Sequence, residues 1–141
     1  MEITLEIAQN LADHCLKHAK DKQMNPLTVA VVDAAGTLKV LLRQDGTSLL
    51  RAEIAQGKAR GAVGMGMGSR ALYDRAVAQP FFIQAMNAIS GGCLVPVPGG
   101  VLIKNDGKII GAIGITGDTS DNDEACAIYA IEALGLTADA G

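Results

Sequence analysis

The sequence has no tryptophan, and with two tyrosines and two phenylalanines its aromatic content is only 3% of 141 residues. Because 49% of the residues are nevertheless hydrophobic, the core must be built from aliphatic side chains. A strongly basic surface is also missing, since the formal net charge is −3 with acidic and basic residues mixed along the chain. Without a cationic stripe or aromatic stacking groups, we expect no binding of nucleic acid.

Long hydrophobic runs are absent as well, and no stretch approaches the ~20 apolar residues of a membrane-spanning helix. The N-terminal sequence MEITLEIAQN begins acidic and becomes amphipathic, unlike a secretory signal. Cys15, Cys93 and Cys126 are odd in number and widely spaced, which favours free thiols in a reducing cytoplasm over a disulfide framework or a zinc site. We therefore expect one cytoplasmic domain over residues 1–141, not associated with a membrane, with a disordered tail at 137–141.

Catalytic signatures are equally scarce. The chain contains no CxxC and no HExxH motif. The glycine-rich stretch from Gly64 to Ser69 lacks the lysine of a phosphate-binding loop and follows a predicted helix, so it is not a dinucleotide fingerprint either. A hydrolase therefore has little support from the sequence.

Hydrophobic periodicity and turn residues predict helices and β-hairpins in alternation. We expect helices near residues 3–23, 48–65, 70–77, 81–89 and 122–134, and strands at 27–33, 37–43, 101–104 and 108–116. Asn105-Asp106-Gly107 between two apolar runs is a strong hairpin signal. Hairpins make neighbouring strands antiparallel, so the fold class is α+β.

Glycines interrupt several of these elements. Gly111, Gly114 and Gly117 lie in the last long strand, where a missing side chain indicates the close approach of a helix, a ligand or a second subunit. Gly57 and Gly61 are four residues apart in a helix and would let another helix pack closely there.

The only two histidines are His14 and His18, four residues apart in the first helix. They project from one side of the helix together with Ile7 and Leu11, at the margin of its buried stripe. Two imidazoles at this spacing can bind one transition metal, and either can ligate haem iron. The alternative is a pair of solvated histidines without a ligand.

Other side chains have a possible binding role beside an ordinary structural one. Met65 and Met67 suit packing against a flat apolar ring, or they fill space in a loop. Arg43 ends a strand where it can meet an anionic group, or it forms a salt bridge. Asp33 either caps the first hairpin turn or serves as a catalytic carboxylate. The carboxylates at 121–124 either cap the last helix or bind a cation.

Four segments together point to a known family. They are PGGVLIKNDGKIIGAIGITG, DNDEACA, VAVVDAAGTLKVLLRQDG and AQGKARGAVGMGMGSRAL. In this combination the chain resembles the GlcG/HbpS-like haem-binding family over nearly its whole length. Within that family it is most similar to the C-terminal domain of PduO-type cobalamin adenosyltransferases.

The resemblance implies a profilin-like antiparallel sheet of about five strands with helices on both faces. A strand over 93–97 would supply the fifth, and the two prolines of this region confine it to an edge or a bulge. The resemblance also implies a homo-oligomer, with dimers assembling to an octamer. For the site it implies haem, with His18 as the iron ligand and His14 as the weaker candidate. Leu11, Met65 and Met67 would then cover the ring, and Arg43 would meet a propionate.

The function that follows is a haem-binding or other tetrapyrrole-binding accessory protein with a redox or corrinoid-related role. The haem would lie near the first helix at a subunit interface, and a bacterial microcompartment is one location consistent with the resemblance. Two alternatives stay open. One is an enzyme acting on a small molecule near Gly99-Gly100, with Asp33, Arg43 or the acidic cluster at 121–124 as acid, base or anchor. The other is a sensory or structural oligomer without a cofactor.

Overall fold

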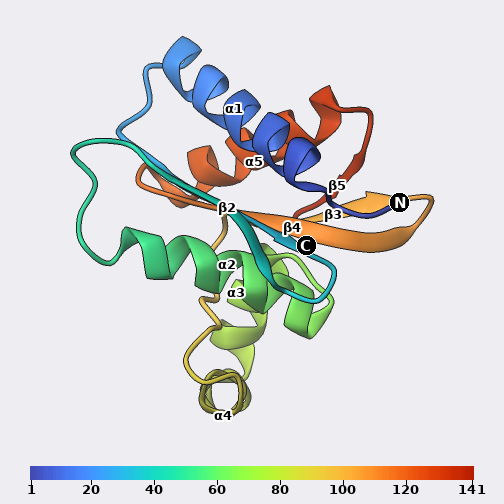
Figure 1. Ribbon diagram of the computed structural model, residues 1–141. Coiled ribbons are helices and arrows are strands. Elements are labelled where there is room, and N and C mark those ends of the chain that lie inside the picture. Colours follow the sequence, from blue (N-terminus) through green and yellow to red (C-terminus); the bar gives the residue numbers. More distant parts are fainter.

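The computed structural model describes residues 1–141 and consists of five helices and one five-stranded sheet (Figure 1). The helices are α1 (Leu5–Asp21), α2 (Arg51–Met65), α3 (Ser69–Ala78), α4 (Pro80–Ile89) and α5 (Ser120–Ala133). The strands are β1 (Thr28–Asp33), β2 (Leu38–Arg43), β3 (Gly100–Asn105), β4 (Lys108–Thr116) and β5 (Thr137–Asp139). No helix is both long and apolar enough to cross a bilayer.

The strand order in the sheet is β2-β1-β4-β3-β5, and every pair is antiparallel. The β1–β2 and β3–β4 pairs are the two predicted hairpins, and β4 joins them by pairing with both β1 and β3. The α+β class and the antiparallel sheet of five strands are thus confirmed.

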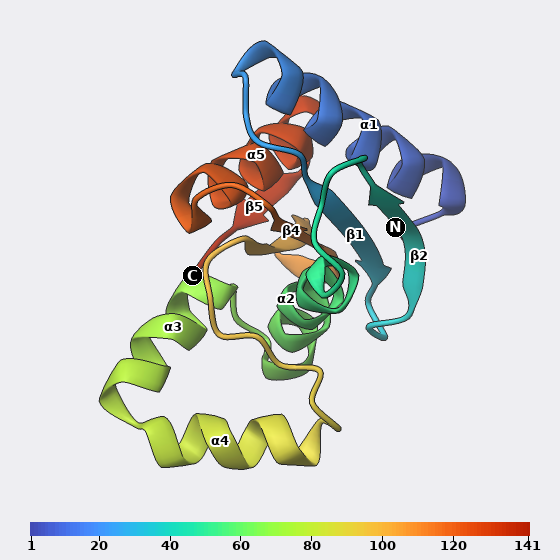
Figure 2. The same cartoon turned by 90° about the vertical axis from the view of Figure 1, so that its left-hand side faces the viewer.

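Helices cover both faces of this sheet, as expected (Figures 1 and 2). Helices α1 and α5 pack together on one face, and α2 lies on the other with α3 and α4 beyond it. Alternate residues of β1 serve the two sides: Val29 and Val31 join the larger core under α1 and α5, and Val32 joins the smaller core against α2. The buried hydrophobic side chains are aliphatic apart from Cys15 and Cys126, and none is aromatic, as the composition requires.

Gly114 shows why β4 needs glycine. A β-carbon there would stand 2.0 Å from the carbonyl oxygen of Ala55 in α2. Of the three alternatives for this glycine, a helix, a ligand or a second subunit, the helix is therefore the one found. The absence of a side chain at Gly114 sets the distance between α2 and the sheet.

The predicted strand at 93–97 is wrong. This segment runs as irregular chain along α2, where Gly57 and Gly61 leave room for Val95 and Leu94. Its one backbone hydrogen bond to α2 runs from the Val95 amide to the Gly57 carbonyl, over 3.2 Å. The two glycines thus admit an extended segment and not the second helix that their spacing suggested.

The fifth strand is instead the C-terminal tail, so the expected disorder at 137–141 is also wrong. Strand β5 pairs with β3, and Lys104 Nζ lies 2.6 Å from Asp139 Oδ2 across that pair. Beyond the strand, the carbonyl of Ala140 accepts a hydrogen bond from the Arg70 amide over 3.2 Å. The tail is ordered because it completes the open edge of β3.

Candidate functional site

His18 lies on the outer side of the α1–α5 layer. Thr4 caps α1 by accepting from the Ile7 amide over 3.2 Å, and the helical spacing then places His18 beside α5. Its imidazole stacks on the ring of Tyr129, with 4.4 Å between the ring centroids and 28° between the planes. The side chain is half-buried, and no protein group makes a hydrogen bond to its ring nitrogens. His18 therefore has a fixed ring plane and free nitrogen atoms.

The electrostatic surroundings of this imidazole favour its neutral form. Burial lowers the pKa of His18 below its usual 6.5, and the nearby Lys22 ammonium lowers it further against the opposing effect of Asp21. Neutral imidazole is the form that coordinates a metal ion. The lowered pKa of His18 therefore favours the form that an iron ligand requires.

His14 is one turn closer to the N-terminus and is also half-buried. Its Nδ1 lies 2.7 Å from the carbonyl oxygen of Asn10 and must carry the proton, because a carbonyl only accepts. This bond leaves Nε2 as the unprotonated nitrogen. A hydrogen bond of this kind commonly orients metal-ligating histidines, so His14 is a competent second ligand or an alternative to His18.

The other predicted site residues are not brought together with the histidines within one chain. Leu11 is 0% exposed and belongs to the core under α1, so it cannot contact a bound ring. Met65 and Met67 lie at the end of α2 and just beyond it, on the opposite face of the sheet, where they pack on the small cluster of Leu72, Ile83 and Leu94.

Arg43 ends β2 and is held by its own loop. Its Nε donates to Thr47 Oγ1 over 2.8 Å, and an Nη donates to the Thr47 carbonyl over 2.9 Å. The shallow hollow beside it is lined by neither histidine. The cation near His18 is instead Lys22, and the aromatic surface beside it is Tyr129. Both were missed from the sequence, although Tyr129 is the only aromatic residue of the last predicted helix.

The region around Gly99-Gly100 offers no room for a small substrate. Both glycines are buried, and a β-carbon on Gly100 would lie 2.4 Å from the Lys58 carbonyl oxygen. The carboxylates of the α5 N-terminus are also occupied, since Arg70 pairs with Asp121 and Glu124. Asp123 faces the buried Lys58. The enzyme alternative at this position has no cavity to support it.

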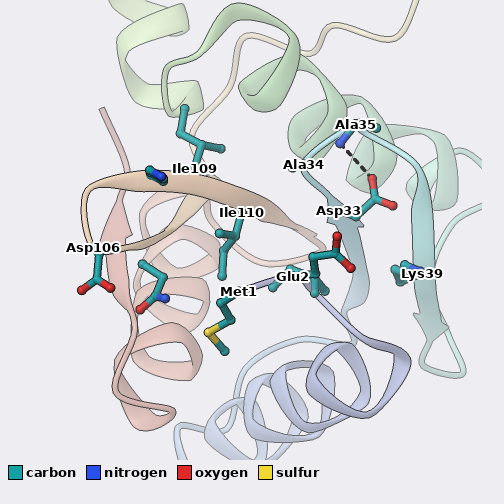
Figure 3. A pocket seen from close by; sticks show the side chains of 12 residues that line it. Met1, Glu2, Asp33, Ala34, Ala35, Lys39, Asp106, Ile109 and Ile110 are labelled. Carbon is teal, nitrogen blue, oxygen red and sulfur yellow. Dashed lines mark hydrogen bonds between the residues drawn. The ribbon is translucent and has the colours of Figure 1, made fainter.

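Asp33 caps its turn, as the structural interpretation expected. Its Oδ1 accepts from the backbone amides of Ala35 and Thr37 over 2.9 and 3.0 Å. The residue borders a cavity of about 510 Å³ between the chain start and the two hairpin turns, with Glu2 and Lys39 beside it (Figure 3). This cavity lies near the opposite end of α1 from His18, about 20 Å along the helix axis at 1.5 Å per residue. No histidine lines it.

The chain has no group of three or more His, Cys, Asp or Glu side chains placed to hold a bare metal ion. A haem needs only one or two axial ligands from the protein, because the macrocycle supplies the other four. The two histidines therefore fit a haem better than a bare metal ion.

The fold is an α+β domain of the profilin-like type, with one antiparallel sheet between two helical layers. The pair of histidines on α1 is its candidate ligand site. The model of the family described as "Haem degrading protein HbpS-like" matches residues 3–132. The chain belongs to this HbpS-like family.

Solved structures of relatives agree with this assignment. The crystal structure of a PduOC–haem complex is 29% identical to this chain and superimposes on it with a TM-score of 0.85, over 96% of this chain and 97% of that one. The crystal structure of HbpS is 28% identical over 96% of this chain and 92% of that one, with a TM-score of 0.82. Protein ORFY of Klebsiella pneumoniae, at 23% identity and a TM-score of 0.86, covers 96% of this chain and 92% of that one and shows the shared fold.

Among curated proteins, the corrinoid adenosyltransferase PduO of Salmonella typhimurium is 34% identical over 112 residues, which is 79% of this chain and 33% of that protein. PduO of Citrobacter freundii is 27% identical over 96% of this chain and 40% of its own length. The chain thus spans about a third of the length of these relatives. An uncharacterised 15.0 kDa protein of Citrobacter freundii matches along 90% of its own length, at 28% identity over 92% of this chain.

Proposed function

We propose that this protein binds haem through His18, on the outer surface that α1 and α5 form together. The observation that carries the proposal is the state of the His18 ring: half-buried, stacked on Tyr129, and without a hydrogen bond to either nitrogen. A solvated histidine has no need of a stacked partner, and a structural histidine would use its nitrogens inside the fold. The haem complex of the PduOC relative supports haem as the bound group.

A second copy of the chain would complete this site. Within one chain, the four best-formed hollows are lined by neither His14 nor His18, so none of them encloses a ring at the histidines. The exposed part of Tyr129 and the Lys22 ammonium offer one face of a site, apolar contact and a partner for a propionate. The opposite face has to come from another subunit.

Haem would supply a redox-active iron, and this chain would hold the ring, supply a neutral imidazole and limit access of water. The similarity to part of the corrinoid adenosyltransferase PduO favours an accessory role in corrinoid handling, either in the cytoplasm or inside a microcompartment.

The test is haemin titration of the purified protein, followed by the Soret absorption band and its position. We expect saturable binding in the wild type and loss of at least tenfold in affinity in His18→Ala, because the iron loses its strongest protein ligand. His14→Ala should weaken binding less and leave the main band position unchanged.

His18→Ala needs a control for the loss of ring stacking. Tyr129→Leu keeps an apolar surface and both histidines, so it should retain the spectrum of a histidine-ligated haem with lower affinity. Unchanged affinity and spectrum in the variant lacking both histidines would refute histidine ligation, even if haemin still adhered to the surface.

A further inference from the structure

A second hollow lies on the other face of the molecule, between α2, α4 and the segment that follows α4. Its volume is about 370 Å³, and most of its lining is apolar, including Val63, Met65, Met86, Ile89 and Leu94. This volume is within the range of ~300–1,000 Å³ that is usual for small-molecule sites. Its helices, α2 and α4, lie on the other side of the sheet from α1 and α5 (Figure 2).

One charged side chain lines this hollow, and it is Arg60. Arg60 is exposed, forms no salt bridge, and makes its only side-chain hydrogen bond to the sulfur of Cys93, with Nη1 3.1 Å from Sγ. A guanidinium has five N–H donors in a planar fork, so most of its donors are left free for a planar anion. No acidic side chain lines the hollow to compete for them.

We propose that this hollow, here called the α2–α4 pocket, binds a small carboxylate with an apolar tail. The carboxylate would be held by the fork of Arg60 at the mouth, and the tail would lie against Met65, Met86 and Leu94. Methionine side chains adapt to tails of different shape, which favours a class of ligands over one compound. The proposal is independent of haem binding on the opposite face.

Cys93 provides a local reporter, because it lines the α2–α4 pocket and is half-exposed, whereas Cys15 and Cys126 are 0% exposed. The experiment measures the alkylation rate of Cys93 by iodoacetamide with increasing octanoate, using peptide mass spectrometry of the folded protein. We expect saturable protection by octanoate, and none at equal concentration from octanol, which has the same tail without the charge.

Two substitutions separate the charge from the apolar volume. Arg60→Gln should raise the octanoate concentration for half-protection at least tenfold. For Arg60→Lys this concentration should lie between those of the wild type and Arg60→Gln. Gly64 lines the pocket, and a β-carbon there meets nothing within 4 Å, so Gly64→Leu should fill the space and abolish protection. Lys17→Gln, a charge removal at an exposed site of α1 on the other face of the sheet, should leave half-protection unchanged.

A direct measurement makes the result independent of the thiol. Calorimetric titration of Cys93→Ser with octanoate should still show binding at one site per chain. Equal protection by octanol, equal protection in Arg60→Gln, or no protection at millimolar octanoate would each overturn the proposal. None of these outcomes bears on haem binding, which is measured at the Soret band.

Discussion

At the scale of single residues, the most demanding environment is that of Lys58 and Asp123. They are 2% and 1% exposed, and Lys58 Nζ lies 3.6 Å from Asp123 Oδ2. Lys58 also donates to the Ile115 carbonyl over 2.8 Å, and Asp123 accepts from the Asp118 amide over 3.0 Å. Burial shifts each group toward its neutral form, lowering the pKa of Lys58 and raising that of Asp123, and each partner's charge counteracts the shift. The pair joins α2 to α5 at the end of the sheet.

Replacing Lys58 with methionine should therefore destabilise the fold by about 3–5 kcal/mol, because the Asp123 carboxylate would stay buried without its counter-charge. The measurement is the free energy of unfolding from denaturant titration at pH 7. The double variant Lys58→Met/Asp123→Asn should be more stable than Lys58→Met alone, since it removes the orphan charge and keeps an acceptor for the Asp118 amide.

The pH dependence gives a second check on the same pair. An acid whose folded pKa is raised favours folding below its unfolded pKa of 3.8, and this contribution is lost as the pH rises through the folded value. Without Lys58 the folded pKa of Asp123 should rise further. The stability difference between wild type and Lys58→Met should thus shrink as the pH falls from 7 toward 4, and a difference independent of pH would contradict the buried-charge argument.

Sequence reasoning could not find this pair. In the sequence, Lys58 is one of several charged residues of a glycine-rich helix, and Asp123 is one of several acids at the start of the last helix. The two are 65 positions apart, and no local pattern connects them. By contrast, the histidine spacing fixes a shared side of one helix, so their common half-buried position was predictable. Periodicity places the histidines at the margin of α1, but it cannot show that Tyr129 of α5 stacks on His18.

At the scale of elements, the contact between α2 and β4 depends on Gly114. A β-carbon there would meet backbone atoms of Ala55 and Ala59, at 2.0 and 2.8 Å, and backbone cannot rotate away. Gly114→Ala should lower the free energy of unfolding by about 1–3 kcal/mol, the usual cost of overpacking. The measurement is chemical unfolding.

Gly64→Ala is the matched control for that substitution. It adds the same methyl group to α2 at a position where nothing lies within 4 Å. In a helix this replacement should be neutral or stabilising by up to about 1 kcal/mol. Equal destabilisation by both substitutions would mean that the α2–β4 distance is not the reason for glycine at 114.

The elements that sequence reasoning placed correctly are those with their own local signals. Strand β4 has the predicted limits because Asp106-Gly107 fixes its start and Gly117 its end. Thr119 caps α5 by accepting from the Asn122 amide over 3.2 Å. The errors concern partners far away in sequence. The tail forms β5 only because β3 has a free edge, and the segment with Pro96 and Pro98 cannot take that edge while it packs on α2.

At the scale of the whole molecule, the sheet separates the two groups of residues that the resemblance assigned to haem. The histidines lie on the α1–α5 face, and Met65 and Met67 lie on the α2 side. A ring bound to one chain at His18 therefore cannot touch Met65 or Met67 of the same chain. The site proposed at His18 would therefore need its second wall from another chain, and oligomerisation becomes the property to test.

Helices α3 and α4 carry the exposed apolar side chains that association would cover. Tyr73, Val77 and Phe81 follow one another at four-residue spacing and are 47%, 70% and 85% exposed. Side chains of this size left in water indicate an interaction surface. We expect light scattering at micromolar concentration to give a mass well above the 14.5 kDa of one chain, and Phe81→Glu to shift the protein toward smaller species. Asn87→Asp adds a charge to the same helix without removing apolar surface, so it should leave the mass unchanged. A wild-type protein that stays at 14.5 kDa would contradict both the interface and the shared haem site.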